Sequence, residues 1–308
     1  MRFSLRQLEV FVAVSRYESA SRAAEVLSLS QSAISMALME LEKQFDTQLF
    51  DRDRKRLRLN EIGRLLLPKA IELLDRAQEI ETLLAGGAGF GPLRIGASLT
   101  IGNYLATLLI GNFMQQHPSC RIHLDVANSA TIIERVAHFD LDLGLIESDC
   151  QHPDIEVIPW IKDELVIFVA PEHPLAHKSE LSLDDLVAAK WIVRELGSGT
   201  RQTFDHAMRD VLSQLNILLE LEHTEAIKRA VESGLGIGCV SRLALKDAFR
   251  RGSLVPLVIP GLDFGRHFHF LVHKKKFRTH GMQEFLALCQ QVSATVQYSD
   301  EIVLPRVT

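Results

Sequence analysis

The sequence lacks the long apolar runs of a membrane or exported protein, and it has few cysteines. No stretch of its 308 residues approaches the ~20 consecutive apolar residues that a membrane helix needs. Residues 1–7 lead directly into charged, amphipathic sequence without the apolar core of a signal peptide, so we expect a cytoplasmic protein. The four cysteines lie far apart with no C-x-x-C spacing, which favours reduced thiols over a redox pair: Cys120, Cys150, Cys239 and Cys289.

The sequence also lacks an excess of basic residues, because its formal net charge is −5. That balance gives no sign of a nucleic-acid partner, but DNA contacts only a local patch of a protein, so the total charge decides little. Hydrophobic residues make up 47% of the chain and charged residues 24%, which argues against disorder. At ~150 residues per domain, the length predicts two or three domains.

Residues 1–60 are predicted to form short helices that include a helix-turn-helix. Ser4 and Gln7 have the spacing of a capping box, and Ser19 and Ser30 are placed to cap a second and a third helix. The turn between these two helices is very short, which favours a helix-turn-helix, although similar hairpins occur in proteins that do not bind DNA. The third helix is expected to bury a stripe of apolar residues: Ile34, Leu38, Leu41 and Phe45.

A basic segment follows these helices. Five of the eight residues 51–58 are basic and two are acidic, and Arg56 and Arg58 alternate with Leu57 and Leu59. This alternation predicts a strand with one apolar and one basic face. A solvated hairpin has the same pattern, but beside a helix-turn-helix we interpret the hairpin as a wing that contacts phosphates.

The third helix would present uncharged side chains to the major groove. We expect Gln31 and Ser35 to help specify the base sequence, and Arg52, Arg54 and Arg56 to contact phosphate. Packing of the methionines against the wing is the alternative for that face. The predicted DNA-binding residues are Ser30, Gln31, Ser32, Ser35, Met36, Met39, Arg52, Arg54, Lys55 and Arg56.

Residues 61–85 have the pattern of one long helix with an apolar seam. A single helix cannot bury such a seam well, so we expect it to pair with the same helix of a second copy; packing against its own wing domain is the alternative. Residues 86–92 contain four glycines and a proline, which marks a domain boundary. The predicted dimerisation residues are Leu66, Ala70, Leu73, Ala77, Ile80 and Leu84.

From residue 93 onward, predicted strands and helices alternate. This order is typical of an α/β domain with mainly parallel sheets, and its length fits one large domain or two lobes. The candidate strands are 93–97, 121–126, 141–146, 164–169, 191–194, 218–221, 237–240 and 268–272.

The N-terminal residues resemble the DNA-binding domain of LysR-type transcriptional regulators. Two positions depart from that pattern: Ser32 stands where the family often has proline, and Asp46 where it often has glycine. Neither departure removes a predicted DNA contact. The matching segments are 5–11 (LRQLEVF), 21–24 (SRAA), Leu27, 30–35 (SQSAIS), 41–42 (LE), 49–52 (LFDR) and Gly63.

The remaining chain resembles the family's effector domain, a two-lobed type 2 periplasmic-binding-protein fold. The general motifs are 95–98 (IGAS), 140–144 (DLDLG), 173–175 (HPL) and 234–238 (GLGIG). Segments 98–104 (SLTIGNY) and 194–201 (RELGSGTR) resemble the branch with regulators of sulfur metabolism, including sulfite-responsive ones. The resemblance implies dimers that often join into tetramers, with double-stranded promoter DNA, a second copy, a small effector and RNA polymerase as partners.

Sequence and resemblance together predict an α + α/β chain of four parts. These are a winged helix-turn-helix at 1–60, a linker helix at 61–85, a hinge at 86–92 and an effector-binding domain at 93–308. Lobe I would take about 93–162 and 268–298, and lobe II about 163–267.

Two segments with small hydroxyl side chains are predicted to bind an anion. Each lies where a strand gives way to a helix, so unpaired backbone N–H groups and the helix dipole favour negative charge. Capping of the helices by these hydroxyls is the alternative, and it is compatible with ligand contact. Arg194 and Arg201 would add positive charge, unless either forms an ion pair with Glu195 or Glu147. The resemblance places them on opposite lobes facing one cleft, where Glu147 would bias the site against large or multiply charged anions. We expect sulfite or sulfate, with an organic carboxylate second. The predicted effector-binding residues are Ser98, Leu99, Thr100, Ile101, Glu147, Gly197, Ser198, Gly199, Thr200 and Arg201.

Other functions fit the sequence less well. A solute-binding protein would share the two-lobed domain but would have no use for a helix-turn-helix. The glycines at 234–238 lack the last glycine of a dinucleotide fingerprint, since Cys239 stands there, and 197–200 lacks the Gly-Lys of a P-loop, so we expect no enzyme and no cofactor. A solvent-facing row is favoured over a metal site for His267, His269 and His273.

Overall fold

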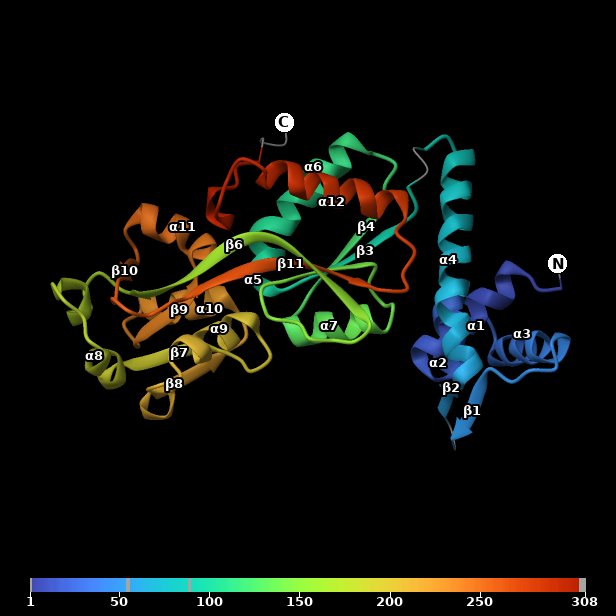
Figure 1. Cartoon of the computed structure of the whole chain (residues 1–308), viewed down its shortest axis with the longest axis horizontal. Coiled ribbons are helices and arrows are strands. Elements are labelled where there is room, and N and C mark those ends of the chain that lie inside the picture. The colour runs from blue at the N-terminus through green and yellow to red at the C-terminus, as the bar shows by residue number, and fades with distance from the viewer. Residues whose placement is uncertain (1, 54–55, 88–89, 305–308) are drawn as a thin grey trace. The chain divides into compact units, whose positions relative to one another are not determined.

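The computed structural model describes residues 2–53, 56–87 and 90–304, and the chain divides into two compact units (Figure 1). The first unit comprises Met1–Pro92, Ser119–Arg121 and Lys274–Gln283. The second comprises Leu93–Pro118, Ile122–His273 and Glu284–Thr308.

The first unit contains a helix-turn-helix, a hairpin and one long helix. Ser4 and Gln7 form the predicted capping box, and the side chains of Ser19 and Ser30 accept the expected hydrogen bonds from the backbone of the second and third helices. The residue after the second helix, Ser28, has a φ of 53°, and this left-handed turn leads into the third helix. The elements are α1 (Leu5–Tyr17), α2 (Ala20–Leu27), α3 (Gln31–Gln44), β1 (Phe50–Asp53), β2 (Arg56–Leu59) and α4 (Glu61–Leu84).

The core of this unit lies where its helices meet. Phe11 and Val14 of α1, Ala23 of α2 and Ile34 of α3 have no more than a trace of exposed surface. The prediction that Phe45 is buried is wrong, because α3 ends one residue earlier and the Phe45 side chain is 48% exposed.

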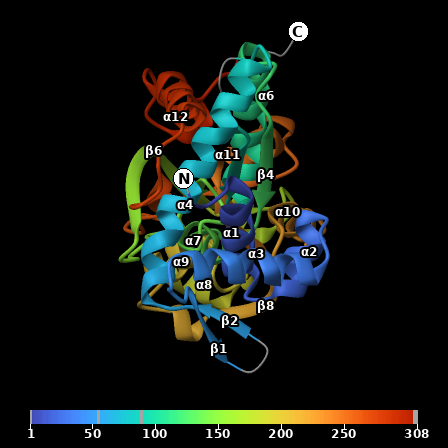
Figure 2. The same cartoon turned by 90° about the vertical axis from the view of Figure 1, so that its right-hand side faces the viewer.

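The basic hairpin forms as the alternation predicts. Strands β1 and β2 are antiparallel, with Phe50 opposite Leu59 and Asp53 opposite Arg56. In β2 the arginines are exposed and the leucines half-buried, so the basic face is available to a partner. The hairpin extends away from the helices of its unit in both views (Figures 1 and 2).

The second unit is built on a sheet in which two parallel parts flank an antiparallel middle. The strand order is β4-β3-β5-β11-β6-β9-β7-β8, and β10 pairs with β6. The strands are β3 (Leu93–Ala97), β4 (Ile122–Val126), β5 (Leu143–Ile146), β6 (Ile155–Val169), β7 (Lys190–Arg194), β8 (Asn216–Leu221), β9 (Ile237–Ser241), β10 (Val255–Leu257) and β11 (Gly265–His273).

All eight predicted strands are present, but the expectation of mainly parallel pairing is only partly right. Strand β3 pairs in parallel with β4 and β5, and β7 with β8 and β9. The two longest strands, β6 and β11, pair antiparallel with each other and with their neighbours. They run through both lobes, and their register shifts between Phe268 and His269. Apolar content does not reveal strand direction, so the sequence did not predict that these two strands run antiparallel to their neighbours.

Helices cover both lobes, and each lobe has its own core. Ile132, Leu141 and Leu271 belong to the core of lobe I, and Trp191 and Phe204 to one core of lobe II. The predicted fold class is confirmed. The helices are α5 (Leu99–Ile101), which continues through the π-helical turn η1 (Gly102–Ala106) into α6 (Thr107–Gln116), then α7 (Ser129–Ala137), α8 (Leu183–Ala188), α9 (Gly199–Ala207), α10 (Thr224–Glu232), α11 (Arg242–Arg251) and α12 (His280–Ser293).

Candidate functional site

Helix α3 presents an exposed polar face next to its buried stripe. Gln31, Ser32 and Ser35 are exposed, and the amide of Gln31 donates to Ser35 Oγ at 3.1 Å. Met36 and Met39 are 54% and 59% exposed, so neither methionine is buried against the wing. Ser30 caps the helix, and its hydroxyl lies 2.9 Å from that of Ser32. The predicted reading residues thus share one accessible face of α3.

Two of the predicted phosphate-binding residues lie in the strands of the hairpin. Arg56 is exposed at the start of β2, and Arg52 lies in β1 opposite Leu57. Arg54 and Lys55 lie outside the described residues. The exposed Arg58, which was not among the predicted DNA-binding residues, follows on the same face of β2 as Arg56.

The seam of α4 divides into two halves. Ala70 is buried and Leu66 half-buried against the core of their own unit, and both also line the groove described below, so their pairing with a second copy stays a prediction. Leu73 is 38% exposed, and exposure rises to 58% at Ile80 and 82% at Leu84. The C-terminal half of the seam therefore has an apolar surface that its own domain leaves uncovered.

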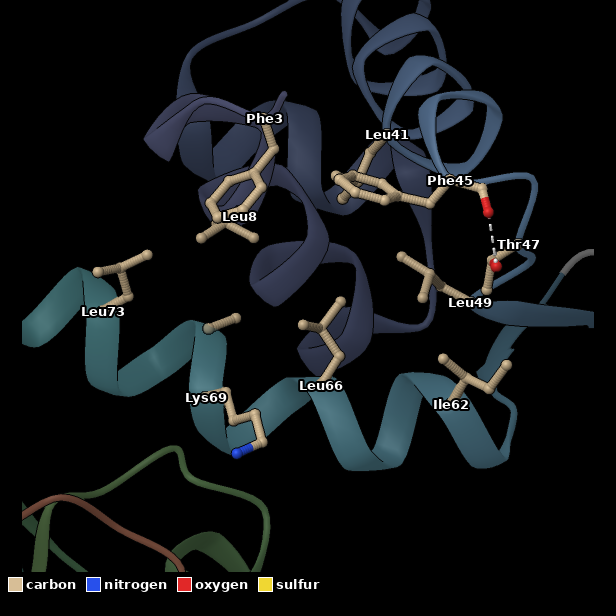
Figure 3. Close-up of a pocket in the computed structure, with 11 residues that line it drawn as sticks. Phe3, Leu8, Leu41, Phe45, Thr47, Leu49, Ile62, Leu66, Lys69 and Leu73 are labelled. Carbon is tan, nitrogen blue, oxygen red and sulfur yellow. Dashed lines mark hydrogen bonds between the residues drawn. The ribbon is translucent and has the colours of Figure 1, made fainter. Parts of the chain in front are cut away.

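An apolar groove of about 390 Å³ adjoins this seam (Figure 3). Phe3 and Leu8 lie on one side, Leu41 and Phe45 come from α3 and the residue after it, and Leu73 extends from α4. The exposed side chain of Phe45, which the sequence predicted to be buried, lines this groove.

The first predicted effector segment lies at the carboxyl end of β3. Ser98 and Thr100 are each 1% exposed, and Leu99 and Ile101 are buried beside them. Ser98 does not cap the helix with its side chain; its hydroxyl donates instead to the carboxylate of Glu147, which is also buried, just beyond the end of β5. The hydroxyl is therefore directed across to the neighbouring strand end.

The second segment lies at the carboxyl end of β7 and contacts lobe I. Gly197 has a φ of +88°, and its carbonyl accepts a 3.2 Å hydrogen bond from the N–H of Ala130. A Cβ at Gly199 would lie 2.8 Å from Glu147 Cγ and 2.9 Å from the backbone nitrogen of Ser148. The glycines thus allow α9 of lobe II to pack directly against the end of β5 in lobe I.

The hydroxyls of this second segment have separate roles. Ser198 caps α9, accepting from the N–H of Arg201 at 3.0 Å, and Thr200 is 1% exposed. The expectation that Arg201 adds charge to the site is not supported, because its guanidinium binds Asp205 and Glu220, each at 2.8 Å.

Sequence reasoning missed the guanidinium at the centre of this cluster. Arg266 of β11 donates to Asp163 at 2.7 Å and to Thr200 Oγ1 at 3.2 Å, and it lies 3.9 Å from Glu147. Asp163 also accepts hydrogen bonds from the hydroxyls of Ser241 and Ser299. Arg266 and Asp163 belong to no local motif, and only the pairing of β6 with β11 brings them together at the contact between the lobes.

A second contact joins the lobes through α10. Tyr104 of lobe I donates a hydrogen bond to Glu225, which also binds Lys228 at 2.7 Å. Burial first, and then the Glu225 carboxylate, raise the pKa of Tyr104 well above its usual value, so the phenol remains a donor at neutral pH. Arg194 is buried and forms the alternative ion pair expected for it, with Glu195 at 2.7 Å.

A groove of about 360 Å³ lies at the edge of the cleft. Its walls come from both lobes and include Ala130, Ser148, Gly197, Ser198 and Arg201. Three predicted effector residues, Gly197, Ser198 and Arg201, therefore line this groove, although Ser198 is only 2% exposed. Ser98, Thr100 and Thr200 are buried and do not line it.

The histidines of β11 do not form a single solvent-facing row. His267 is exposed, but His273 is buried and stacks on Phe139 with 3.8 Å between the ring centroids, so the prediction is wrong for His273. Burial lowers the pKa of His269. Within the described part of the chain, no group of three side chains is arranged to hold a metal ion.

The chain matches two domains of one protein family. Residues 5–64 match the bacterial regulatory helix-turn-helix proteins of the lysR family, and residues 86–294 match the LysR substrate binding domain. The chain belongs to the LysR family. It is a LysR-type transcriptional regulator with an effector-binding domain, which is not an enzyme function.

Similar proteins match this LysR-type regulator over two thirds or more of its length. It is 43% identical, over 94% of this chain and 98% of the relative, to the uncharacterized HTH-type transcriptional regulator YeiE of Escherichia coli K12. A full-length OxyR variant of Pseudomonas aeruginosa is similar with a TM-score of 0.67 and 21% identity, covering 94% of each chain. The CcmR regulatory domain of Synechocystis PCC6803, in complex with 2-PG, is similar with a TM-score of 0.62 and 28% identity over 67% of this chain and 98% of that chain.

No helix in residues 2–53, 56–87 and 90–304 is both long and apolar enough to cross a membrane.

Proposed function

We propose that this regulator binds promoter DNA as a dimer or a larger assembly, and that a small anion held between the lobes of its effector domain modulates the binding. The observation that carries the proposal is the buried contact of Ser98, Glu147, Gly199, Thr200 and Arg266, which come from both lobes. Ligands of such sheets bind beyond the carboxyl ends of parallel strands. A ligand that bridges the lobes would favour their closure.

We favour a sulfite-like oxyanion as the effector. Buried hydroxyls and backbone N–H groups suit a small anion, because hydrogen bonds to a charged group are stronger than those between neutral groups. The Glu147 carboxylate would repel a dianion but would accept a hydrogen bond from a protonated oxyanion, so sulfate should bind less well than sulfite at the same pH. The sulfur-metabolism resemblance of residues 98–104 and 194–201 supports the same ligand class.

An organic carboxylate is the second candidate. The interlobe groove of about 360 Å³ lies beside Ser198 and would admit a carbon skeleton, and the similar CcmR domain is in complex with 2-PG. In this case the carboxylate would approach the N-terminus of α9 from the groove.

For assembly, we propose that the C-terminal seam residues pair with α4 of a second copy: Leu73, Ile80 and Leu84, which are exposed, and Ala77, which is half-buried. The apolar groove beside Phe45 and Leu73 lies next to this seam, so a partner helix would cover both surfaces at once.

The effector proposal is tested by a thermal-shift and calorimetric titration of the full chain with sulfite, sulfate and 2-PG. A ligand present at 100 times its Kd stabilises the native state by about 2.7 kcal/mol, which raises the melting temperature measurably. We expect sulfite to bind, sulfate to bind more weakly, and 2-PG to have no effect. Binding of 2-PG alone would support the carboxylate alternative, and binding of none of the three would overturn the proposal.

A further inference from the structure

One buried guanidinium at the contact between the lobes has hydrogen-bonding capacity that the folded chain does not use. The side chain of Arg266 is 4% exposed; Nε donates to Asp163, and Nη1 donates to Thr200. The third nitrogen, Nη2, is buried and has no hydrogen-bond partner among the residues that the structure describes. A buried charged N–H without an acceptor is unfavourable, so this position is suited to an oxygen acceptor from outside the chain.

The geometry points to Arg266 as the cationic group that holds the effector anion through Nη2. This inference rests on the proposed function and adds to it a residue from β11. Arg266 contacts Thr200 at the N-terminal end of α9 and lies 3.9 Å from Glu147 at the end of β5, so it touches a predicted effector residue on each lobe. A planar guanidinium can bind a carboxylate through Nε and still present Nη2 to an oxyanion.

Neutralisation of Asp163 is the structural role that competes with this one. Asp163 is 1% exposed and accepts hydrogen bonds from Arg266 Nε, Ser241 Oγ and Ser299 Oγ. That role needs only the Nε edge of the guanidinium and leaves Nη2 unexplained. The two roles predict different behaviour when the charge pair is removed as a unit.

The test measures sulfite affinity by calorimetry on the full chain and its variants. Arg266→Lys keeps the charge but removes the fork, and we expect it to weaken sulfite binding at least tenfold. Asp163→Asn combined with Arg266→Gln removes both charges, so no buried carboxylate is left to neutralise. Because the proposed contact through Nη2 is also lost, sulfite binding should still be at least tenfold weaker than in the wild type. The matched control is Arg242→Gln. Arg242 pairs with Glu164, the neighbour of Asp163 in β6, but its side chain is 42% exposed, so this variant should bind sulfite with unchanged affinity.

Wild-type affinity in the double variant would overturn the inference, because Arg266 would then serve only to neutralise Asp163. A measurement on the unaltered protein keeps the test decisive if the variants do not fold. A crystal soaked with selenite should show an anomalous peak within hydrogen-bond distance of Arg266 Nη2, and a selenite bound elsewhere would refute the assignment.

The outcomes also separate this inference from the proposed function. If Thr100→Ala and Thr200→Ala weaken sulfite binding while the Arg266 variants do not, the effector site stands and the role of Arg266 falls. If the wild-type chain binds neither sulfite nor selenite, the oxyanion proposal and the role of Arg266 fall together.

Discussion

Gly199→Ala should weaken effector binding by forcing the lobes apart. The new methyl would lie 2.8 Å from Glu147 Cγ, 2.9 Å from Ser148 N and 3.0 Å from Glu147 C, all closer than normal contacts. Two of these atoms are backbone, so a rotamer change cannot relieve the clash, and α9 must move away from the end of β5. Overpacking of this kind costs about 1–3 kcal/mol. The φ of Gly199 lies in the ordinary range, so the substitution adds no backbone strain.

If that cost falls on the closed arrangement, sulfite affinity should drop by about 5- to 150-fold, since 1.4 kcal/mol corresponds to a factor of ten. The assay is a calorimetric titration with sulfite, beside thermal unfolding of the ligand-free protein. Gly281→Ala is the matched control, because its new Cβ would find its nearest neighbour at 3.7 Å. Unchanged affinity in Gly199→Ala, with the loss appearing only as reduced thermal stability, would refute closure through this contact.

Three further predictions follow from the other surfaces. Leu73→Asp should shift the chain toward monomer in sedimentation and abolish tight operator binding, because it places a charge in the exposed seam without disturbing the core; an undiminished dimer would contradict this. Arg56→Ala should weaken specific and random DNA similarly and flatten the salt dependence by about 1 unit of slope in filter binding, whereas a loss confined to specific DNA would show a base contact. Thr100→Ala and Thr200→Ala should each weaken effector binding by about 1–2 kcal/mol in calorimetry while leaving sedimentation unchanged, and full affinity in both would place the site elsewhere.

The sequence was most informative where the pattern is local. Caps at Ser4, Ser19 and Ser30 and the alternation in β2 depend on neighbouring residues, and the structure has them as predicted. Phe45 was misjudged because the apolar spacing continues one residue beyond the end of α3.

The rest depends on contacts between distant residues. The antiparallel crossing of β6 and β11 brings Asp163 to Arg266 across a separation of 103 residues, and no local pattern announces such a pair. Likewise, Leu66 and Ala70 share the helical spacing of the later seam residues, and that spacing does not reveal that these two pack against the core of their own domain. The strand ends rich in hydroxyl side chains could be found from the sequence. The Arg266 guanidinium between them could be found only once the pairing of β6 with β11 was known.

An anion held between the lobes should change the affinity of the regulator for DNA. The most direct measurement is a fluorescence-anisotropy titration of the full chain on an operator obtained by in vitro selection, with and without sulfite, in the wild type and in the Thr100→Ala/Thr200→Ala double variant. We predict that sulfite changes the wild-type affinity or salt slope and has no effect on the double variant at the same concentration. An identical sulfite response in both proteins, or none in the wild type, would contradict the account.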